Sequence, residues 1–399
     1  MNIQVKSTSV QFWILMGIVL IAGFSQGMLM PVISILFEQD GVSSSLNGIN
    51  TSAVYLGILL TAPFVGIILR KIGFKNSLIV GGAIVIVCLG LFPIWKSFWF
   101  WLVLRFIIGI GDSILQIGAQ TWITTFSPQN RRGLYVALFG LFFGLGFGIG
   151  PMMTNLLLIN EALPFVVSAL FGLLALIPLF ILQNQYPETE AYNDNSSSKR
   201  HVRTVFKYAW VALLFPLGYG FLEAALNGSF PVYALQSDIS VRAVSIILPA
   251  FAIGSVVLQL PLGAMSDRYG RKRILTISLV IGLASFFTAG LLQESTSALF
   301  ICFAIAGMFV GSIYSLGVAY MVDLLPRHLL TAGNTLCSVL YSMGSLSGPI
   351  IGGASLQYIK GINFFYIISG FLLIILIALS MFRSRGKGDL SIGTNLHDV

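Results

Sequence analysis

Three ionisable side chains stand inside long apolar stretches of this 399-residue chain. Arg105 and Asp112 share one stretch, and Glu223 lies near the middle of another. A charged side chain in a lipid environment costs at least about 2.5–3.5 kcal/mol, so such residues generally face a partner or a water-filled cavity. A carboxylate in that position can take up and release a proton. All three residues are therefore candidates for coupling proton movement to the binding of a polar ligand.

The spacing of these residues suggests different roles for the two carboxylates. Arg105 and Asp112 are seven positions apart, which places them on one face of a helix and about 10 Å apart along its axis. A long side chain or a bound ligand could bridge that distance, and Arg105 could hold Asp112 in its ionised form. This favours Glu223 as the proton carrier. The alternative for each residue is a buried polar contact that fixes helix packing.

Uncharged polar side chains in the same stretches are candidates for lining a central cavity. They are Gln26, Tyr55, Gln116, Gln120, Tyr219, Asn227, Gln259 and Tyr314. The alternative is that they form hydrogen bonds between neighbouring helices. The histidines, His201, His328 and His397, fall outside the apolar stretches, which excludes a histidine relay for protons.

The sequence also argues against enzyme chemistry. Cys88, Cys302 and Cys337 lie in apolar stretches without the spacing of metal ligands, so we interpret them as small core residues and expect no metal. The phosphate-binding pattern G-x-x-x-x-G-K-[ST] is absent, which excludes the use of ATP by this chain alone. We find no plausible pair of nucleophile and base. We therefore expect neither an enzyme nor a bound cofactor.

The elements that hold these residues are predicted to be membrane-spanning helices. Apolar residues make up 56% of the chain and charged residues 9%, against about 25% charged residues in soluble domains. A helix needs roughly 20 apolar residues to cross a bilayer, and short alternating strands typical of a barrel are not seen. We predict an all-α membrane protein. Its twelve spans are expected at 11–37, 46–69, 76–95, 98–124, 132–159, 161–182, 206–236, 241–265, 273–292, 296–323, 328–357 and 361–382.

The distribution of basic residues predicts how these spans are oriented. With the N-terminus inside, the loops on the outer face carry only Lys96, Arg242 and Lys360, and the other loops carry almost all the remaining Lys and Arg. The positive-inside rule then places both termini in the cytoplasm of a plasma membrane of the bacterial inner-membrane type. The net charge of +8 belongs to these loops, so nucleic acid is not an expected partner. The first apolar run lacks a cleavage site and is read as a retained helix.

A polar stretch between Leu182 and Phe206 divides the spans into two sets of six. Its charged and serine-rich composition is typical of a flexible cytoplasmic linker. The predicted domains are a first bundle at 1–182, the linker at 183–205, a second bundle at 206–385 and a cytoplasmic tail at 386–399.

The two halves repeat one another in sequence. The loop pattern that begins at Gly66 recurs at Gly263, 197 positions later, and the Gly146-x-x-x-Gly150-Pro151 pattern recurs as Gly344-x-x-x-Gly348-Pro349. Pro128 pairs with Pro326, 198 positions later, which is also the spacing between Gly146 and Gly344. Parallel repeats of this kind form a central cavity between two halves that rock to give alternating access.

These patterns resemble the major facilitator superfamily over essentially the whole chain. The second loop copy matches the family signature G-x-x-x-D-R-x-G-R-K at Gly263, Asp267, Arg268, Gly270, Arg271 and Lys272. The first copy keeps Gly66 and Gly73 but has Arg70 where the family has an acid. Arg105-x-x-x-Gly109-x-Gly111 is similar to the second family motif. The Gly-Pro pattern resembles the twelve-helix drug–proton antiporter branch, although only its second copy keeps the final glycines, Gly352 and Gly353.

The resemblance implies a role for each motif. The loop copies would form a cytoplasmic gate, in which Asp267 faces Arg131 and Arg132, and the departure at Arg70 suggests a reversed pair with Asp323. The Gly-Pro motifs would let their helices bend, because proline frees a carbonyl and glycines allow close approach. The alternative for the loop motif is a simple anchor of membrane topology. The alternative for the Gly-Pro motifs is static packing of small residues.

The function implied is secondary active transport, with proton-coupled efflux of a small organic compound as the leading hypothesis. The proton gradient would supply the driving force, and the partners would be the substrate, protons and membrane lipids, with the chain acting as a monomer. Proton-coupled uptake of a metabolite, flipping of a lipid or lipid-linked sugar, and a non-transporting receptor or scaffold are the alternatives.

Overall fold

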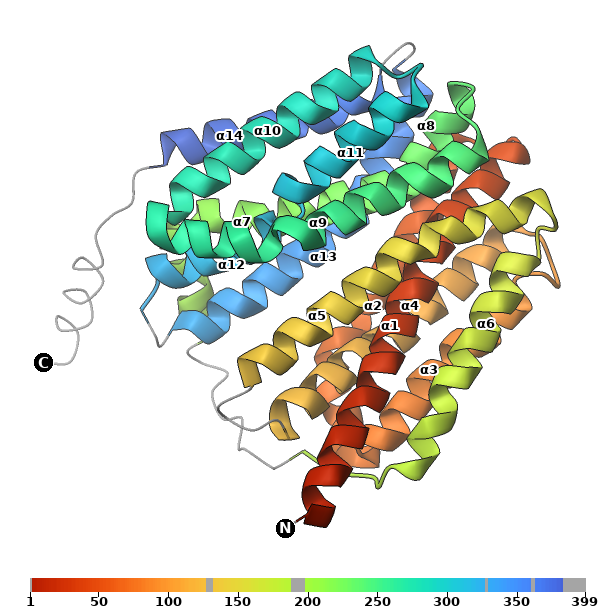
Figure 1. Ribbon diagram of the computed structural model, residues 1–399, viewed down its shortest axis with the longest axis vertical. Coiled ribbons are helices and arrows are strands. Elements are labelled where there is room, and N and C mark those ends of the chain that lie inside the picture. Colours follow the sequence, from red (N-terminus) through yellow and green to blue (C-terminus); the bar gives the residue numbers. More distant parts are fainter. Residues whose placement is uncertain (1, 127–131, 188–197, 327–328, 360–362, 383–399) are drawn as a thin grey trace, which may run out of the picture. The chain divides into compact units, whose positions relative to one another are not determined.

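The computed structural model describes residues 2–126, 132–187, 198–326, 329–359 and 363–382. Every regular element in these ranges is helical (Figure 1). Eleven of the helices described there are long and apolar enough to cross a membrane. The predicted all-α membrane fold is therefore confirmed.

The predicted spans of the first half appear as helices, although α1 begins well before the predicted start at residue 11 and two spans end in a different type of helix. The helices are α1 (Asn2–Gln39), α2 (Ser44–Ile72), α3 (Phe74–Leu91), α4 (Phe98–Phe126), α5 (Arg132–Ile149) and α6 (Leu163–Leu176). Two of them continue as the tighter 3-10 helices η2 (Gly150–Leu158) and η3 (Ile177–Ile181). Both 3-10 segments carry a proline in their first turn, where its missing N–H is tolerated.

The second half contains two spans that are interrupted. Its helices are α7 (Ser198–Gly228), α8 (Phe230–Gln236), α9 (Val241–Tyr269), α10 (Arg271–Leu291), α11 (Thr296–Val310), α12 (Ile313–Leu324), α13 (Leu330–Tyr358) and α14 (Phe364–Met381). The predicted span 206–236 breaks before Pro231, and 296–323 breaks at Gly311 and Ser312. α7 also begins inside the segment predicted as a linker, and its backbone leaves helical geometry at Ala209 (φ −126°, ψ 17°), where the helix is kinked.

The predicted span at 328–357 differs from the other spans in having a lower hydropathy. It forms the 29-residue helix α13, but this helix is not among the eleven that are apolar enough by composition alone. Its sequence is rich in Gly, Ser, Thr and Asn, which lower hydropathy while allowing other helices to approach closely. α13 is therefore a helix of full spanning length whose composition is more polar than that of the other spans.

The helices form two compact units. The first comprises Met1–Thr189, Ala225–Ile253 and Pro349–Lys360, and the second comprises Glu190–Ala224, Gly254–Gly348 and Gly361–Val399. Segments of α7, α9 and α13 thus belong to the first unit although they come late in the chain. The domain boundaries expected from the sequence stay a prediction, and the tail at 386–399 lies outside the described residues.

In each unit, pairs of helices pack in close backbone contact at glycine residues. In the first unit a Cβ placed on Gly146 of α5 would lie 1.9 Å from the carbonyl oxygen of Leu20 in α1. In the second unit a Cβ on Gly344 of α13 would lie 2.0 Å from the carbonyl oxygen of Leu217 in α7. The sequence repeat is thus a repeat of backbone contacts.

The Gly-Pro motifs differ in helical geometry. The first copy marks a change from α to 3-10 geometry, since α5 ends at Ile149 and η2 begins at Gly150 and Pro151. In the second copy α13 runs through Pro349 as one helix. A local change of helix type accompanies only the copy that lacks the final glycines.

The first unit joins helix ends from both halves of the sequence. The side chain of Gln236 donates hydrogen bonds to Glu38 (2.9 Å) and to the Ser44 hydroxyl (3.0 Å). The backbone N–H of Ser45 donates to the side-chain oxygen of Gln357 at 3.1 Å. All five residues lie at helix ends predicted to face the outside.

Candidate transport site

Arg105 lies at the centre of a buried polar cluster in the first unit. Its side chain is fully buried in α4. One guanidinium nitrogen, Nη1, donates to the Thr51 hydroxyl at 2.9 Å, and Nη2 donates to the carbonyl oxygens of Leu29 (3.1 Å) and Met30 (3.4 Å). Arg105 therefore connects α4 with α1 and α2 through the guanidinium fork.

Close helix packing beside Arg105 brings these partners within reach. A Cβ on Gly109 of α4 would lie 2.1 Å from the carbonyl oxygen of Val54, and one on Gly57 of α2 would lie 2.3 Å from that of Phe106. The glycines let the two backbones touch. The motif that resembles the second family signature thus positions α2 against Arg105.

Asp112 is also buried in α4, but Arg105 does not bind it. The described hydrogen bonds of Arg105 go to Thr51 and to two backbone carbonyls. Among the described residues, Asp112 Oδ2 has no hydrogen-bond partner. The suggestion that Arg105 holds Asp112 ionised is not supported by a contact between them.

Glu223 forms a second polar cluster, in the second unit. The hydroxyl of Tyr341 in α13 donates a 2.6 Å hydrogen bond to Glu223 Oε2 in α7. The ring of Tyr341 lies 6.3 Å from that of Tyr219 and 5.5 Å from that of Tyr314, measured between centroids. Tyr219 is one helical turn before Glu223 on α7. A buried carboxylate therefore stands beside three tyrosine rings from three helices.

The other polar candidates divide into buried contacts and exposed positions. Gln116 donates to the side-chain oxygen of Gln26 at 3.3 Å, and the Tyr55 hydroxyl contacts the sulfur of Met30 at 3.4 Å. Asn227 is buried in the first unit. Gln120 and Gln259 are exposed on α4 and α9. The structure thus brings Tyr55 close to the Arg105 cluster.

Two residues of these clusters were not among the sequence candidates. Thr51 and Tyr341 supply the side-chain hydrogen bonds to Arg105 and Glu223. A sequence signal existed for both, because residues three or four apart share one face of a helix. Thr51 is four residues before the candidate Tyr55, and Tyr341 is three residues before the motif residue Gly344. Which polar side chain forms a hydrogen bond with which charged side chain depends on how each helix is rotated about its axis. The sequence does not show this rotation.

The loop motif forms a network of charges in the second unit. Arg271 contacts Asp267, also donates to the Ser266 hydroxyl, and reaches Asp323 Oδ2 from Nε at 3.3 Å. Gly270 has φ +95° and its counterpart Gly73 has φ +83°, which glycine adopts readily. Arg271 thus links the ends of α9, α10 and α12 that are predicted to face the cytoplasm.

The remaining expectations for the loop motif are only partly described. Asp323 is bound by Arg271, and its proposed pairing with Arg70 stays a prediction. Arg131 and the side chain of Arg132, expected near Asp267, lie outside the described residues. Arg70 is exposed, as are Gly66 on α2 and Arg268, and Gly263 has no neighbouring atom where a Cβ would stand.

The last lysine of each loop copy binds the end of a later helix. Lys75 Nζ donates to the carbonyl oxygens of Phe180 (3.1 Å) and Leu182 (2.8 Å), after α6. Its counterpart Lys272 donates to the carbonyl oxygen of Phe382 at 2.7 Å, just after α14. A cation at a helix C-terminus satisfies free carbonyls and is favoured by the helix dipole.

Lys75→Met is expected to lower thermal stability by about 2–6 °C. The change keeps the apolar stem but removes two hydrogen bonds, and partial exposure limits the loss to about 1–2 kcal/mol. Thermal unfolding of the detergent-purified protein measures the shift. Lys71→Met, at an exposed position in the last turn of the preceding helix α2, is the control, and an equal loss there would contradict the capping role.

Arg105→Met is expected to stop transport while the melting temperature changes by no more than a few degrees. Removing the buried charge relieves a desolvation cost of at least about 2.5–3.5 kcal/mol, which offsets the hydrogen bonds that are lost. Unfolding temperature and substrate counterflow in proteoliposomes are measured on the same preparation. A large fall in stability would show that Arg105 serves packing instead.

The described residues contain no group of three or more His, Cys, Asp or Glu side chains that could hold a metal ion. The three cysteines, Cys88, Cys302 and Cys337, are buried and unpaired by disulfides.

Comparison with known proteins agrees with this arrangement. The family described as Major Facilitator Superfamily matches residues 15–236 and 213–395. An uncharacterized MFS-type transporter of Bacillus subtilis, YfkF, is 49% identical over 359 residues, which cover 90% of this chain and 92% of that protein. YcaD, an uncharacterized MFS-type transporter of Salmonella paratyphi B, is 22% identical over 78% of this chain and 79% of its own length.

Solved structures show the same fold at low sequence identity. A mutant of the nucleoside transporter NupG aligns with a TM-score of 0.80 at 15% identity, covering 93% of this chain and all of that one. A bacterial homologue of the human lysosomal transporter Spinster aligns with a TM-score of 0.69 at 14% identity over 94% of both chains. The chain is therefore a multi-pass membrane transporter rather than an enzyme, and it belongs to the major facilitator superfamily.

Proposed function

We propose that this transporter works by alternating access as a monomer and exports a small organic compound in exchange for protons. The observation that carries the proposal is the buried carboxylate of Glu223, which accepts a hydrogen bond from Tyr341 beside two further tyrosine rings. A buried carboxylate is tolerated when it faces a partner or cavity, and it can exchange a proton there. The tyrosines offer aromatic faces and hydroxyl groups to an organic substrate.

Contacts at the helix ends support the alternating-access part of the proposal. Gln236 and Gln357, from the second half of the sequence, bond to Glu38, Ser44 and Ser45 of the first half. These few hydrogen bonds would close the outer side in one state and separate in the other. The Arg271 network with Asp267 and Asp323 would contribute to the inner gate.

The direction of proton movement tests the coupling. Purified protein is placed in liposomes containing a pH-sensitive dye, with equal pH on both sides. A panel of nucleosides, amino acids, sugars and aromatic amines is then added outside. Exchange for protons makes the lumen more alkaline as a compound enters, whereas co-transport acidifies it, and both signs hold for either orientation of the protein.

Each alternative gives a different result. Acidification would favour proton-coupled uptake of a metabolite, the second candidate. Counterflow without any proton movement would contradict proton coupling. Movement of fluorescent lipids without movement of soluble compounds would favour a flippase, and the absence of all transport would favour a receptor or scaffold.

A further inference from the structure

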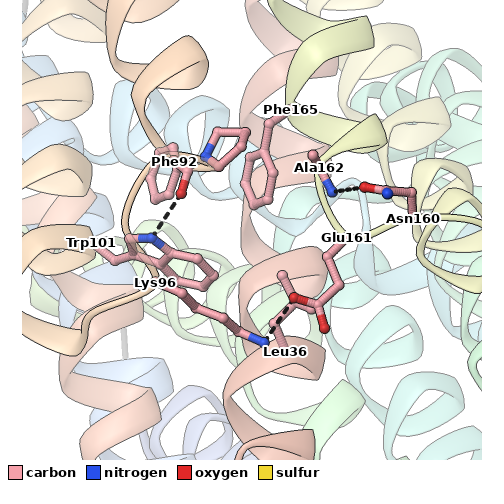
Figure 2. A pocket seen from close by; sticks show the side chains of 9 residues that line it. Leu36, Phe92, Lys96, Trp101, Asn160, Glu161, Ala162 and Phe165 are labelled. Atoms are coloured by element: carbon pink, nitrogen blue, oxygen red, sulfur yellow. Dashed lines mark hydrogen bonds and ion pairs between the residues drawn. The ribbon is translucent and has the colours of Figure 1, made fainter.

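A polar pocket opens at the end of the first unit that is predicted to face the outside (Figure 2). Its volume is about 330 Å³, within the size range of small-molecule sites. Aromatic rings and polar side chains both line it, chiefly Phe92, Trp101, Phe165, Lys96, Asn160 and Glu161. None of these residues belongs to the Arg105 or Glu223 clusters. The pocket is a separate site.

Lys96 ties together three turns around the pocket. Its ammonium lies 2.9 Å from Asp40 Oδ1, just after α1, and 2.8 Å from Glu161 Oε2, just before α6. Burial lowers the pKa of Lys96, but hydrogen bonds to the two carboxylates outweigh burial and raise the pKa above its usual value. Two carboxylates and one ammonium leave the cluster with a net charge of −1.

The cluster keeps binding capacity for both signs of charge. An ammonium has three donors, and two of those of Lys96 are used by the carboxylates. Glu161 has a side chain 57% exposed and a second oxygen available to a donor. Asn160 accepts a hydrogen bond from the backbone N–H of Ala162 at 2.8 Å, which leaves its amide N–H groups for an acceptor. A ligand with one ammonium and one anionic group fits this arrangement.

Exposed apolar side chains stand next in sequence to two of the polar lining residues, and we call them the apolar rim. Ile94 and Trp95, beside the lining residue Lys96, are 72% and 63% exposed, and Ile159, beside Asn160, is 74% exposed. Exposed tryptophans at helix ends are typical of the membrane–water interface. A free solute gains nothing from such a rim, whereas the hydrocarbon chains of a lipid can cover it.

We propose that this pocket binds the headgroup of an outer-leaflet phospholipid with a primary amine. The ammonium of the headgroup donates to Glu161, and the phosphate accepts from Lys96 and Asn160. The acyl chains lie along the apolar rim. A net charge of −1 disfavours a purely anionic headgroup, and a quaternary ammonium lacks the N–H donors that Glu161 requires.

Native mass spectrometry of the delipidated full-length protein tests the proposal. Detergent micelles are doped with dioleoyl phosphatidylethanolamine, phosphatidylcholine or phosphatidylglycerol at equal mole fraction, which keeps bilayer packing out of the comparison. We expect one phosphatidylethanolamine to bind about tenfold more tightly than phosphatidylcholine, since a hydrogen bond to a charged group is worth about one factor of ten. Glu161→Gln should reduce this preference to about twofold or less.

Glu294→Gln is the matched control, because Glu294 is an exposed carboxylate in an outer turn of the second half. It should keep the tenfold preference. Equal binding of all three lipids, a preference that survives Glu161→Gln, or its loss in Glu294→Gln would each overturn the proposal. Displacement of the lipid by an equal concentration of free phosphoethanolamine would overturn the assignment to a lipid. Unfolding temperatures confirm that each variant is folded.

Discussion

Glu223→Gln is expected to abolish the coupled movement of protons while exchange of the transported compound continues. The amide keeps the shape of the side chain and an oxygen that accepts the hydrogen bond from Tyr341, so the tyrosine cluster remains intact. It cannot bind or release a proton during the cycle. Compound-induced pH change in liposomes should fall to the rate of protein-free liposomes, while counterflow at equal pH should persist.

Two further variants separate this role from a structural one. Tyr341→Phe removes the hydroxyl that binds Glu223 but keeps the carboxylate, so proton coupling should survive with a shifted pH dependence. Asp112→Asn tests the other buried carboxylate. If Asp112→Asn stops proton movement and Glu223→Gln does not, Asp112 is the proton carrier and our assignment is wrong.

Gly146→Ala is expected to destabilise the protein by about 1–3 kcal/mol or more, although it adds only one methyl group. The new Cβ would lie 1.9 Å from the carbonyl oxygen of Leu20, and the backbone cannot yield without moving α5 away from α1. Gly344→Ala meets the carbonyl oxygen of Leu217 at 2.0 Å and should behave alike. Folded yield and unfolding temperature in detergent measure the loss.

Gly144→Ala provides a control on the same helix. No atom lies within 4 Å of a Cβ at Gly144, and alanine is a better helix former than glycine by up to about 1 kcal/mol. This variant should be as stable as the natural protein or slightly more so. If Gly146→Ala and Gly144→Ala are indistinguishable, the glycine pattern does not mark a close helix crossing.

Most of the membrane fold could be predicted from the sequence because insertion into lipid depends on local composition. Runs of apolar residues located the spans, and the glycine and proline patterns revealed the repeat. The interruptions of the spans were missed. They lie at Ala209, at Ser229 and at Gly311 and Ser312, and hydropathy averaged over a window does not register a break of one or two residues.

The candidate site was only partly predictable. Arg105, Asp112 and Glu223 stood out because a charge in an apolar run is costly wherever the helix points. Their partners did not stand out. Thr51 is 54 positions from Arg105, and Tyr341 is 118 positions from Glu223. A contact over such separations depends on how each helix is rotated about its axis.

Hydropathy and motif spacing are properties of the linear chain, so they predict a helical membrane transporter with two repeated halves before any contact is known. Which groups meet depends instead on how the helices pack. Arg105 donates to Thr51 and to two backbone carbonyls instead of binding Asp112, and Tyr341 donates to Glu223. Backbone contacts at glycines set the helix rotations, and those contacts exist only once the helices are packed.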